Sequence, residues 1–285
     1  MAFWTTVLVS AAIASIAALG LFLQIRSGQL NVGMAVFVGI GGYASGALGV
    51  TWEMTPWLSI PVAILTGAAF GAAFSAITLR LHHWFFAVTT LTLSIAAVSA
   101  MGRIGALGGA LGLSGIPIVG SPVPALVGLA ACLALALAFD RSQYGLAVRA
   151  TGDDQALAGM FGVQVRRLRV AVFALGSGMA ALSGALAAHR FGLYQPTDLG
   201  VQPSLLLFVY VVIGGRSSVL GPLLGTFFLF TVPELVPMPP EAQLIAFGGI
   251  MTLVAVAFPG GLAHALAHAL ARLRPARRRH LAQTS

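Results

Sequence analysis

Long apolar stretches that lack Arg, Asp and Glu alternate with short charged segments along the chain. There are nine of them, at residues 1–25, 27–52, 54–79, 81–102, 104–139, 170–189, 199–215, 217–233 and 242–271. Each is close to or above the roughly 17–25 residues that a helix needs to cross a hydrocarbon core about 30 Å thick. No alternating strand pattern typical of a membrane barrel occurs. The pattern therefore predicts an all-α, polytopic membrane protein with about nine transmembrane helices.

Composition excludes a water-soluble globular protein. Charged residues make up 8% of the chain and hydrophobic residues 58%, whereas soluble domains are roughly one-quarter charged. The amino terminus lacks the basic segment of a secretory signal, so the first stretch is expected to be a retained span. We expect residues 1–285 to form a single transmembrane domain, with a polar loop at 140–169 and a basic tail at 260–285.

The arginines predict how the chain is threaded. Ten of the fifteen lie in Arg141–Arg169 and Arg272–Arg279, which the positive-inside rule places in the cytoplasm together with the carboxyl terminus. The loop around 190–203 then lies outside. This placement of the positive charge argues against a nucleic-acid partner. The spans are expected near residues 3–24, 32–50, 57–79, 84–101, 122–139, 170–188, 204–214, 218–232 and 242–258.

Two glycine-rich segments depart from plain helix. Gly102–Gly120 holds seven glycines and a proline, which disfavour helix. We expect it to form an external re-entrant or cavity-lining loop. Gly28–Gly49 predicts a thin span, and Gly42-x-x-x-Gly46 has the spacing that allows close helix packing, as does Gly67-x-x-x-Gly71.

The loop at 140–169 is the one long polar stretch between spans and predicts a short docking helix. Thr151-Gly152 precedes Asp153 and Asp154, whose carboxylates suit a helix amino terminus, and Gly162 supplies a stop. Ala156, Leu157, Met160 and Phe161 recur at spacings that expose one apolar face. A helix of about two and a half turns is too short to be stable alone in water. The pattern leaves open whether this face meets the membrane interface or a partner protein.

Four blocks of sequence resemble the LivM-type permease subunits of ABC importers for branched-chain amino acids. They are Gly28–Gly33 with Phe37 to Tyr43, Gly112–Pro117, Ser142–Arg169, and Ile213–Gly215 with Gly221-Pro222, Gly225 and Pro233-Glu234. The resemblance implies a type II-like permease in a bacterial inner membrane. In that family the cytoplasmic loop carries a coupling helix, here Asp153 to Phe161, seated in an ATPase cleft. Arg149, Arg166 and Arg167 would pair with acidic residues of the ATPase or serve only to set topology.

The resemblance also implies partners and a substrate. The partners are a LivH-like second permease subunit, two ABC ATPase subunits and a solute-binding protein, with ATP–Mg bound by the ATPases and no cofactor bound by this chain. The chain has no Lys and so lacks the lysine of a P-loop; we expect a transport subunit, not an enzyme. Branched-chain or other small amino acids are the expected substrates, with urea and short amides as alternatives. Asn31, Met34 and Ala110-Leu111 stand where the family usually carries more polar residues, which leaves the substrate open.

Polar residues within or beside the apolar spans are the candidates for substrate contact. They are Gln29, Asn31, Gly33, Thr89, Thr90, Thr92 and Ser94. Serine and threonine in a span often bond their own helix backbone instead, so both roles stay open here.

Other reactive residues predict no chemistry. His264 and His268 have the spacing of a metal pair without a third ligand, and they suit a helix on the membrane surface. His82-His83 and His189 adjoin predicted interfaces, and Cys132 is expected to be packing. The acids fall in predicted loops, which disfavours a proton-coupled carrier. A self-sufficient secondary transporter or channel remains the alternative class.

Overall fold

The structure is a computed structural model that describes residues 2–81, 83–215, 218–235, 248–249 and 252. The predicted span at 242–258 falls almost wholly outside these residues. The basic tail at 260–285, with His264 and His268, lies outside them as well.

The described chain is an α-helical bundle. Six of its helices are long and apolar enough to cross a membrane: α1 (Ala2–Arg26), α2 (Met34–Thr51), α3 (Pro56–Thr78), α4 (His83–Arg103), α5 (Val123–Arg141) and α8 (Val165–Phe191). The shorter helices are α6 (Gln143–Asp153), α7 (Gln155–Met160), α9 (Val201–Gly214) and α10 (Leu220–Leu235). The multi-pass membrane architecture expected from the apolar stretches is confirmed for these six spans.

The predicted spans near 204–214 and 218–232 are shorter than a membrane crossing requires. At 1.5 Å per residue, α9 and α10 are about 21 and 24 Å long, whereas the hydrocarbon core is about 30 Å thick. The two helices form a tight hairpin. A Cβ at Gly214 would overlap the carbonyl oxygen of Gly221, and one at Gly225 would overlap that of Tyr210. The prediction of nine full spans is therefore not confirmed.

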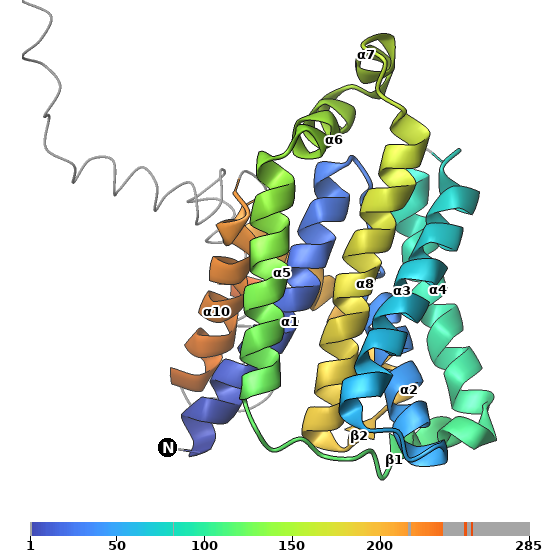
Figure 1. Cartoon of the computed structure of the whole chain (residues 1–285), viewed down its shortest axis with the longest axis vertical. Coiled ribbons are helices and arrows are strands. Elements are labelled where there is room, and N and C mark those ends of the chain that lie inside the picture. The colour runs from blue at the N-terminus through green and yellow to red at the C-terminus, as the bar shows by residue number, and fades with distance from the viewer. Residues whose placement is uncertain (1, 82, 216–217, 236–247, 250–251, 253–285) are drawn as a thin grey trace, which may run out of the picture.

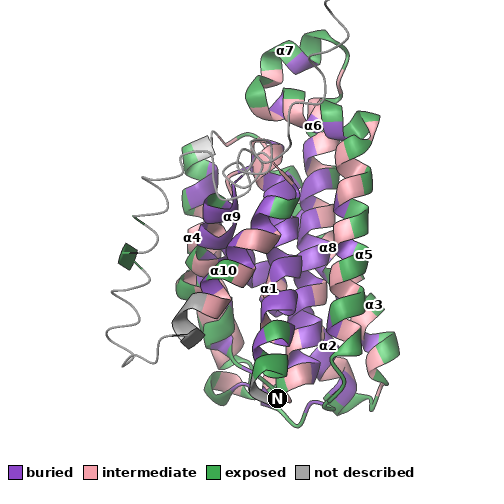
Figure 2. Cartoon of the chain, turned by 90° about the vertical axis from the view of Figure 1, so that its left-hand side faces the viewer, coloured by how far each residue is buried: buried purple, intermediate pink, exposed green. Residues whose placement is uncertain are grey.

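Helix α8 lies at the centre of the bundle and packs against α1, α2 and α3. Most of α1 and α8 is buried, whereas few residues of α3, α4 and α5 are buried and the others are partly or fully exposed (Figure 2). Four phenylalanines from different helices meet edge-on in this core, with ring centroids 5.3–6.1 Å apart: Phe37, Phe74, Phe86 and Phe173. Edge-to-face aromatic pairs add to the stability gained from burial.

Glycines allow the core helices to approach closely, as the spacing of Gly67 and Gly71 predicted. A Cβ at Gly41 would overlap the backbone of Ala181 in α8, and one at Gly67 would overlap the Ala181 side chain. The face with Gly42 and Gly46 meets loop residues instead, because Tyr194 packs on Gly42 and Ile116 on Gly46. The glycine-rich helix α2 thus packs closely against α8 on one face and against the loops of the glycine-rich segment and β2 (Leu193–Tyr194) on another.

The bundle has two distinct ends (Figure 1). Helices α6 and α7 project at one, which we name the α7 end. Strands β1 (Leu113–Ser114) and β2 (Leu193–Tyr194) pair antiparallel at the other, the β end. Three 3-10 turns lie near the strands in sequence: η1 (Gly105–Leu107), η2 (Gly109–Leu111) and η3 (Pro196–Leu199). The glycine-rich loop and the loop after α8 are thus held together by backbone pairing of β1 with β2, which their sequences did not predict.

Candidate functional site

Helix α7 is formed and terminated by its own sequence. Asp154 caps it, because its Oδ1 accepts hydrogen bonds from the backbone N–H of Ala156 (2.8 Å) and Leu157 (3.0 Å). Gly162 ends it with a left-handed φ of 81° and donates to the Gly159 carbonyl. Glycine favours this conformation because it has no Cβ. The predicted stop at Gly162 is confirmed.

The predicted boundaries of the docking helix are wrong at its amino terminus. Asp153 ends α6, and Thr151-Gly152 lie within α6. Only the six residues Gln155–Met160 form α7. The physical reason is that the two aspartates differ in role. Asp154 adopts an extended backbone and caps α7, whereas Asp153 continues a helix that is capped at its own start by Ser142.

The projecting α7 end carries large apolar side chains that are exposed in the described chain. Met160 is 86% exposed and Phe161 79% exposed, while Leu157 is about half exposed. Ala156 is also exposed, and Ala158 alone turns into the fold. A cluster of exposed large apolar side chains marks an interaction site. The cluster of Leu157, Met160 and Phe161 is named the α7 tip below.

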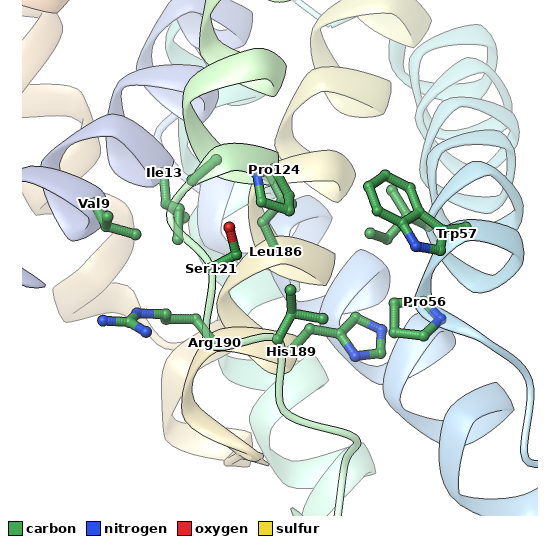
Figure 3. A pocket seen from close by; sticks show the side chains of 12 residues that line it. Val9, Ile13, Pro56, Trp57, Ser121, Pro124, Leu186, His189 and Arg190 are labelled. Carbon is green, nitrogen blue, oxygen red and sulfur yellow. The ribbon is translucent and has the colours of Figure 1, made fainter.

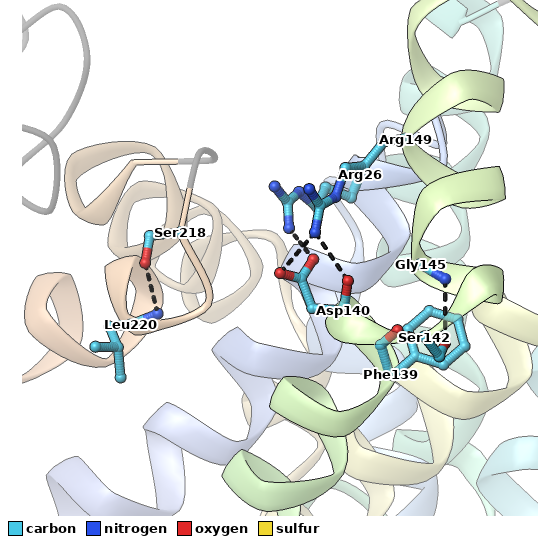
Figure 4. A network of polar contacts seen from close by, with 8 residues as sticks. All are labelled: Arg26, Phe139, Asp140, Ser142, Gly145, Arg149, Ser218 and Leu220. Atoms are coloured by element: carbon cyan, nitrogen blue, oxygen red, sulfur yellow. Dashed lines mark hydrogen bonds and ion pairs between the residues drawn. The ribbon is translucent and has the colours of Figure 1, made fainter. Parts of the chain in front are cut away.

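An ion-pair cluster fixes the base of this projection to the bundle (Figure 4). The Asp140 carboxylate at the end of α5 accepts from Arg26 at the end of α1. It also accepts from Arg149 Nη2 of α6 at 2.9 Å, and Arg149 bonds the Asp140 carbonyl at 2.8 Å. The sequence left two roles open for Arg149, pairing with an acid of the ATPase or setting topology; in the structure it pairs with Asp140 of its own chain. Arg166 and Arg167 are exposed at the α7 end, and their pairing with a partner stays a prediction.

The Asp140→Asn variant is expected to lower the free energy of unfolding by about 2 kcal/mol, because two partly buried guanidinium groups lose their carboxylate. Thermal unfolding of the purified chain in detergent measures this. The neighbouring Arg141→Gln serves as control, since Arg141 is exposed and forms no ion pair among the described residues. Equal melting temperatures for the two variants would show that the cluster contributes nothing.

Helix α6 rests directly on the turn that follows α1. A Cβ at Gly152 would overlap the Arg26 carbonyl oxygen and would lie 3.5 Å from the Gly28 nitrogen. Thr151 beside it is fully buried. The projecting helices are therefore in contact with the point where the chain leaves α1 and enters the interior.

The segment from Ser27 to Gly33 is a non-helical break between α1 and α2. Its side chains Ser27, Gln29 and Asn31 are buried. Asn31 Nδ2 donates to Gln24 Oε1 at 2.8 Å, and Asn31 Oδ1 accepts from the Gly33 N–H at 2.9 Å. Gln29 Nε2 donates to Ser75 Oγ at 2.9 Å. Irregular backbone at membrane depth is tolerated where protein groups satisfy it, and here side chains do so.

Other helices complete this buried polar network. Thr90 Oγ1 in α4 accepts from the Val32 N–H at 3.1 Å. Ser204 Oγ in α9 accepts from the Ala35 N–H at 3.1 Å and lies 3.4 Å from Ser94 Oγ. Gln24 Nε2 donates to the Phe173 carbonyl in α8 at 3.1 Å. The break is thus held by several helices at once.

The structure divides the predicted pathway residues into two groups. Gln29, Asn31, Thr90 and Ser94 are buried and belong to the network, and a Cβ at Gly33 would overlap the Thr90 carbonyl. Thr89 and Thr92 do not join it. Thr92 is exposed, Thr89 is partly exposed, and each hydroxyl donates to the backbone of its own helix at 2.7–2.9 Å.

His189 is a polar centre that the sequence did not reveal. It was expected only to mark the end of a span, yet it is 2% exposed. Its Nδ1 lies 2.8 Å from the Pro117 carbonyl, and its Nε2 lies 2.9 Å from Ser45 Oγ and 3.2 Å from Ser59 Oγ. With the proton on Nδ1, the ring donates to Pro117 and accepts from a serine. A single imidazole thus joins α2, α3, α8 and the glycine-rich loop.

The cavity beside His189 is too small for a metabolite (Figure 3). Its volume is about 30 Å³, and Ile13, Trp57 and Leu186 form part of its largely apolar lining. That is room for about one water molecule. Nearby, burial raises the pKa of the Tyr194 phenol, with Asp198 adding to the shift.

The described residues hold no group of three or more His, Cys, Asp or Glu side chains that could bind a metal ion. Cys132 is buried in α5. The two features with functional character are the exposed α7 tip and the buried Ser27–Gly33 break, which α6 contacts.

Comparison with known proteins supplies the family. The model described as "Branched-chain amino acid transport system / permease component" matches residues 3–255. The high-affinity branched-chain amino acid transport system permease protein LivM of Escherichia coli (strain K12) is 26% identical over 287 residues, covering 86% of this chain and 66% of that protein. The chain therefore spans slightly less than two thirds of this relative.

Shorter matches extend to other permeases. LivH of Salmonella typhimurium (strain LT2) is 27% identical over 139 residues, covering 48% of this chain and 45% of that protein. The ribose import permease protein RbsC of Bacillus subtilis (strain 168) is 28% identical over 146 residues, with the same coverage of each chain. No solved structure matches the chain. From the match over most of its length, this chain belongs to the family of permease components of branched-chain amino acid transport systems.

Proposed function

We propose that the chain is the membrane-spanning permease subunit of an ATP-driven importer for branched-chain or other small amino acids in a bacterial inner membrane. It would work with a LivH-like second permease, two ABC ATPase subunits and a solute-binding protein. The observation that carries this proposal is the α7 tip, whose three large apolar side chains are exposed, Met160 and Phe161 almost fully and Leu157 by about half. A partner surface would bury them.

The proposed mechanism follows from what lies beneath the tip. ATP can shift a permease between two states only if the docked surface makes different contacts in each. Movement of α7 would pass to α6, which is fixed to α1 and α5 through Asp140. From α6 it would reach the Ser27–Gly33 break through the contact of Gly152 with Arg26. The break is the irregular element that a change of state would rearrange.

The positions of the carboxylates favour this class over a proton-coupled carrier. Among the residues whose burial the structure describes, which do not include Glu234 of α10, no Asp or Glu is buried. Proton-driven carriers use such groups within the membrane. The relatives include permeases named for branched-chain amino acids and for ribose. The substrate therefore stays open, and urea and short amides remain alternatives for an ATP-driven permease.

Reconstitution tests the proposal. Proteoliposomes containing this chain with its partner permease and ATPases, supplied with the binding protein, are expected to accumulate radiolabelled leucine only with ATP. Parallel assays with urea and with ribose assign the substrate. Accumulation of solute by this chain alone, without ATPases, would instead establish the secondary transporter or channel.

The Asn31→Ala variant is expected to lower the uptake rate about tenfold or more, because two hydrogen bonds that shape the break, each worth about 1 kcal/mol, are lost. Thr92→Ala is the matched control. Its hydroxyl is exposed and bonds only its own helix, so uptake should stay at the wild-type rate. Initial rates are compared at equal amounts of protein in the membrane. A full rate in Asn31→Ala would remove the break from the pathway.

A further inference from the structure

A groove of about 780 Å³ lies between the α5–α6 corner and the start of α8, at the α7 end of the bundle. Its apolar wall comes from two membrane spans: Phe139 from the last turn of α5, and Leu168, Val172 and Leu175 from the first turns of α8. These α8 residues extend the wall over about 10 Å at 1.5 Å per residue. This part of the groove therefore lies at the level of the membrane.

The opposite part of the groove holds its polar side chains, which lie among Tyr144 and Ala147 of α6 and Val163 before α8. Gln143 of α6, together with Gln164 and Arg167 beside the start of α8, lines it. Arg167 is exposed, and its Nη1 donates to Gln164 Oε1 at 3.0 Å. Within the described residues, no carboxylate lies within ion-pair distance of Arg167, and no Asp or Glu is among the lining residues. The groove thus has an apolar part within the spans and, at their end, a mixed part with one cationic side chain, Arg167.

We propose that this groove binds an anionic phospholipid, with an acyl chain along α5 and α8 and the phosphate at Arg167. A guanidinium group matches the geometry of phosphate oxygens, and basic pockets between spans at the cytoplasmic side are suited to anionic headgroups. Charge complementarity favours this occupant. A soluble partner reaches the α7 tip, whereas the apolar wall of the groove belongs to spans, which lipid surrounds. The proposal does not depend on what the permease carries.

Native mass spectrometry of the purified full chain tests the site, with phosphatidylglycerol and phosphatidylcholine as probes. The wild-type chain should retain phosphatidylglycerol preferentially. The Arg167→Gln variant should lower that retention about fivefold, as expected for one arginine at a lipid surface. Arg166→Gln is the matched control, because it removes the same charge one residue away and Arg166 does not line the groove. Equal losses in the two variants would overturn the proposal in favour of nonspecific attraction.

A second variant tests the apolar half. Ala171 lines the groove and is exposed on α8, so Ala171→Trp should fill it without disturbing the core. We expect this variant to lower phosphatidylglycerol retention as well. If lipid retention is unchanged in Ala171→Trp while co-purification of the ATPase is lost, the groove receives a protein partner and the lipid proposal is wrong.

Discussion

The substitutions Met160→Asp and Phe161→Asp are each expected to abolish ATP-dependent uptake and co-purification with the ATPase, with no loss of folded permease. Both side chains are almost fully exposed, so neither substitution removes packing within the chain. In the proposed complex the same positions enter an apolar contact, where a carboxylate would be buried without a partner. Loss of apolar burial together with that desolvation should weaken docking by about 3 kcal/mol or more, which is at least about a hundredfold.

The matched control for this prediction is a residue in the glycine-rich loop, far from α7 in the sequence. Leu111 is 85% exposed and sits in η2, in the glycine-rich loop. Leu111→Asp introduces the same charge at an equally exposed apolar position, and it should leave binding of the ATPase intact. Pull-down of the tagged ATPase and uptake into proteoliposomes are the two readouts. Wild-type pull-down by both tip variants would show that the α7 tip is not the docking surface.

Valine at Gly184 is expected to prevent the bundle from assembling. A Cβ at this position would overlap the carbonyl oxygen of Val38, and it would lie 2.9 Å from the Gly42 nitrogen. Both are backbone atoms of α2, so no side chain can rotate away. The helices α2 and α8 would have to separate, and the loss of packing in the core should exceed about 3 kcal/mol.

Gly178→Ala in the same helix provides the comparison for Gly184→Val. Its new Cβ would lie 3.4 Å from the Ala68 Cβ, which is an ordinary contact. Alanine also favours helix over glycine by about 1 kcal/mol, so this variant should fold as well as the wild type. Size-exclusion profiles and melting temperatures in detergent compare the two. A monodisperse, stable Gly184→Val protein would contradict the close crossing of α2 and α8.

The local sequence was sufficient to predict the elements that depend only on neighbouring residues. Uninterrupted apolar stretches predicted α1 to α5 and α8, because a helix in lipid needs only length and the absence of charge. Gly162 was predicted to stop the docking helix, since its left-handed conformation depends on one residue. The nearby starting point was wrong, because either aspartate could cap a helix and the choice of Asp154 depends on how far α6 extends.

The candidate site was only partly visible in the sequence. The exposed tip could be predicted from the spacing of Leu157, Met160 and Phe161. The polar residues Gln29 and Asn31 stood out within apolar surroundings, but Thr89 and Thr92 looked equivalent to Thr90. Helix rotation decides which hydroxyl faces the interior, and an apolar helix that is hydrophobic on all sides gives no periodic signal of that rotation.

The sequence by itself determined that this chain crosses a membrane and where its charges gather. It also determined that the polar loop contains a short helix with an apolar face. Only the tertiary structure decided which residues contact each other across the bundle. Arg26 pairs with Asp140, His189 bonds Ser45 and Pro117, and Gly184 packs on the backbone of α2. The hydropathy of a stretch and the capping of a helix depend only on residues that are close in the chain, so both can be predicted from the sequence. Pairing across the bundle depends on how the helices pack, which brings together residues far apart in the sequence.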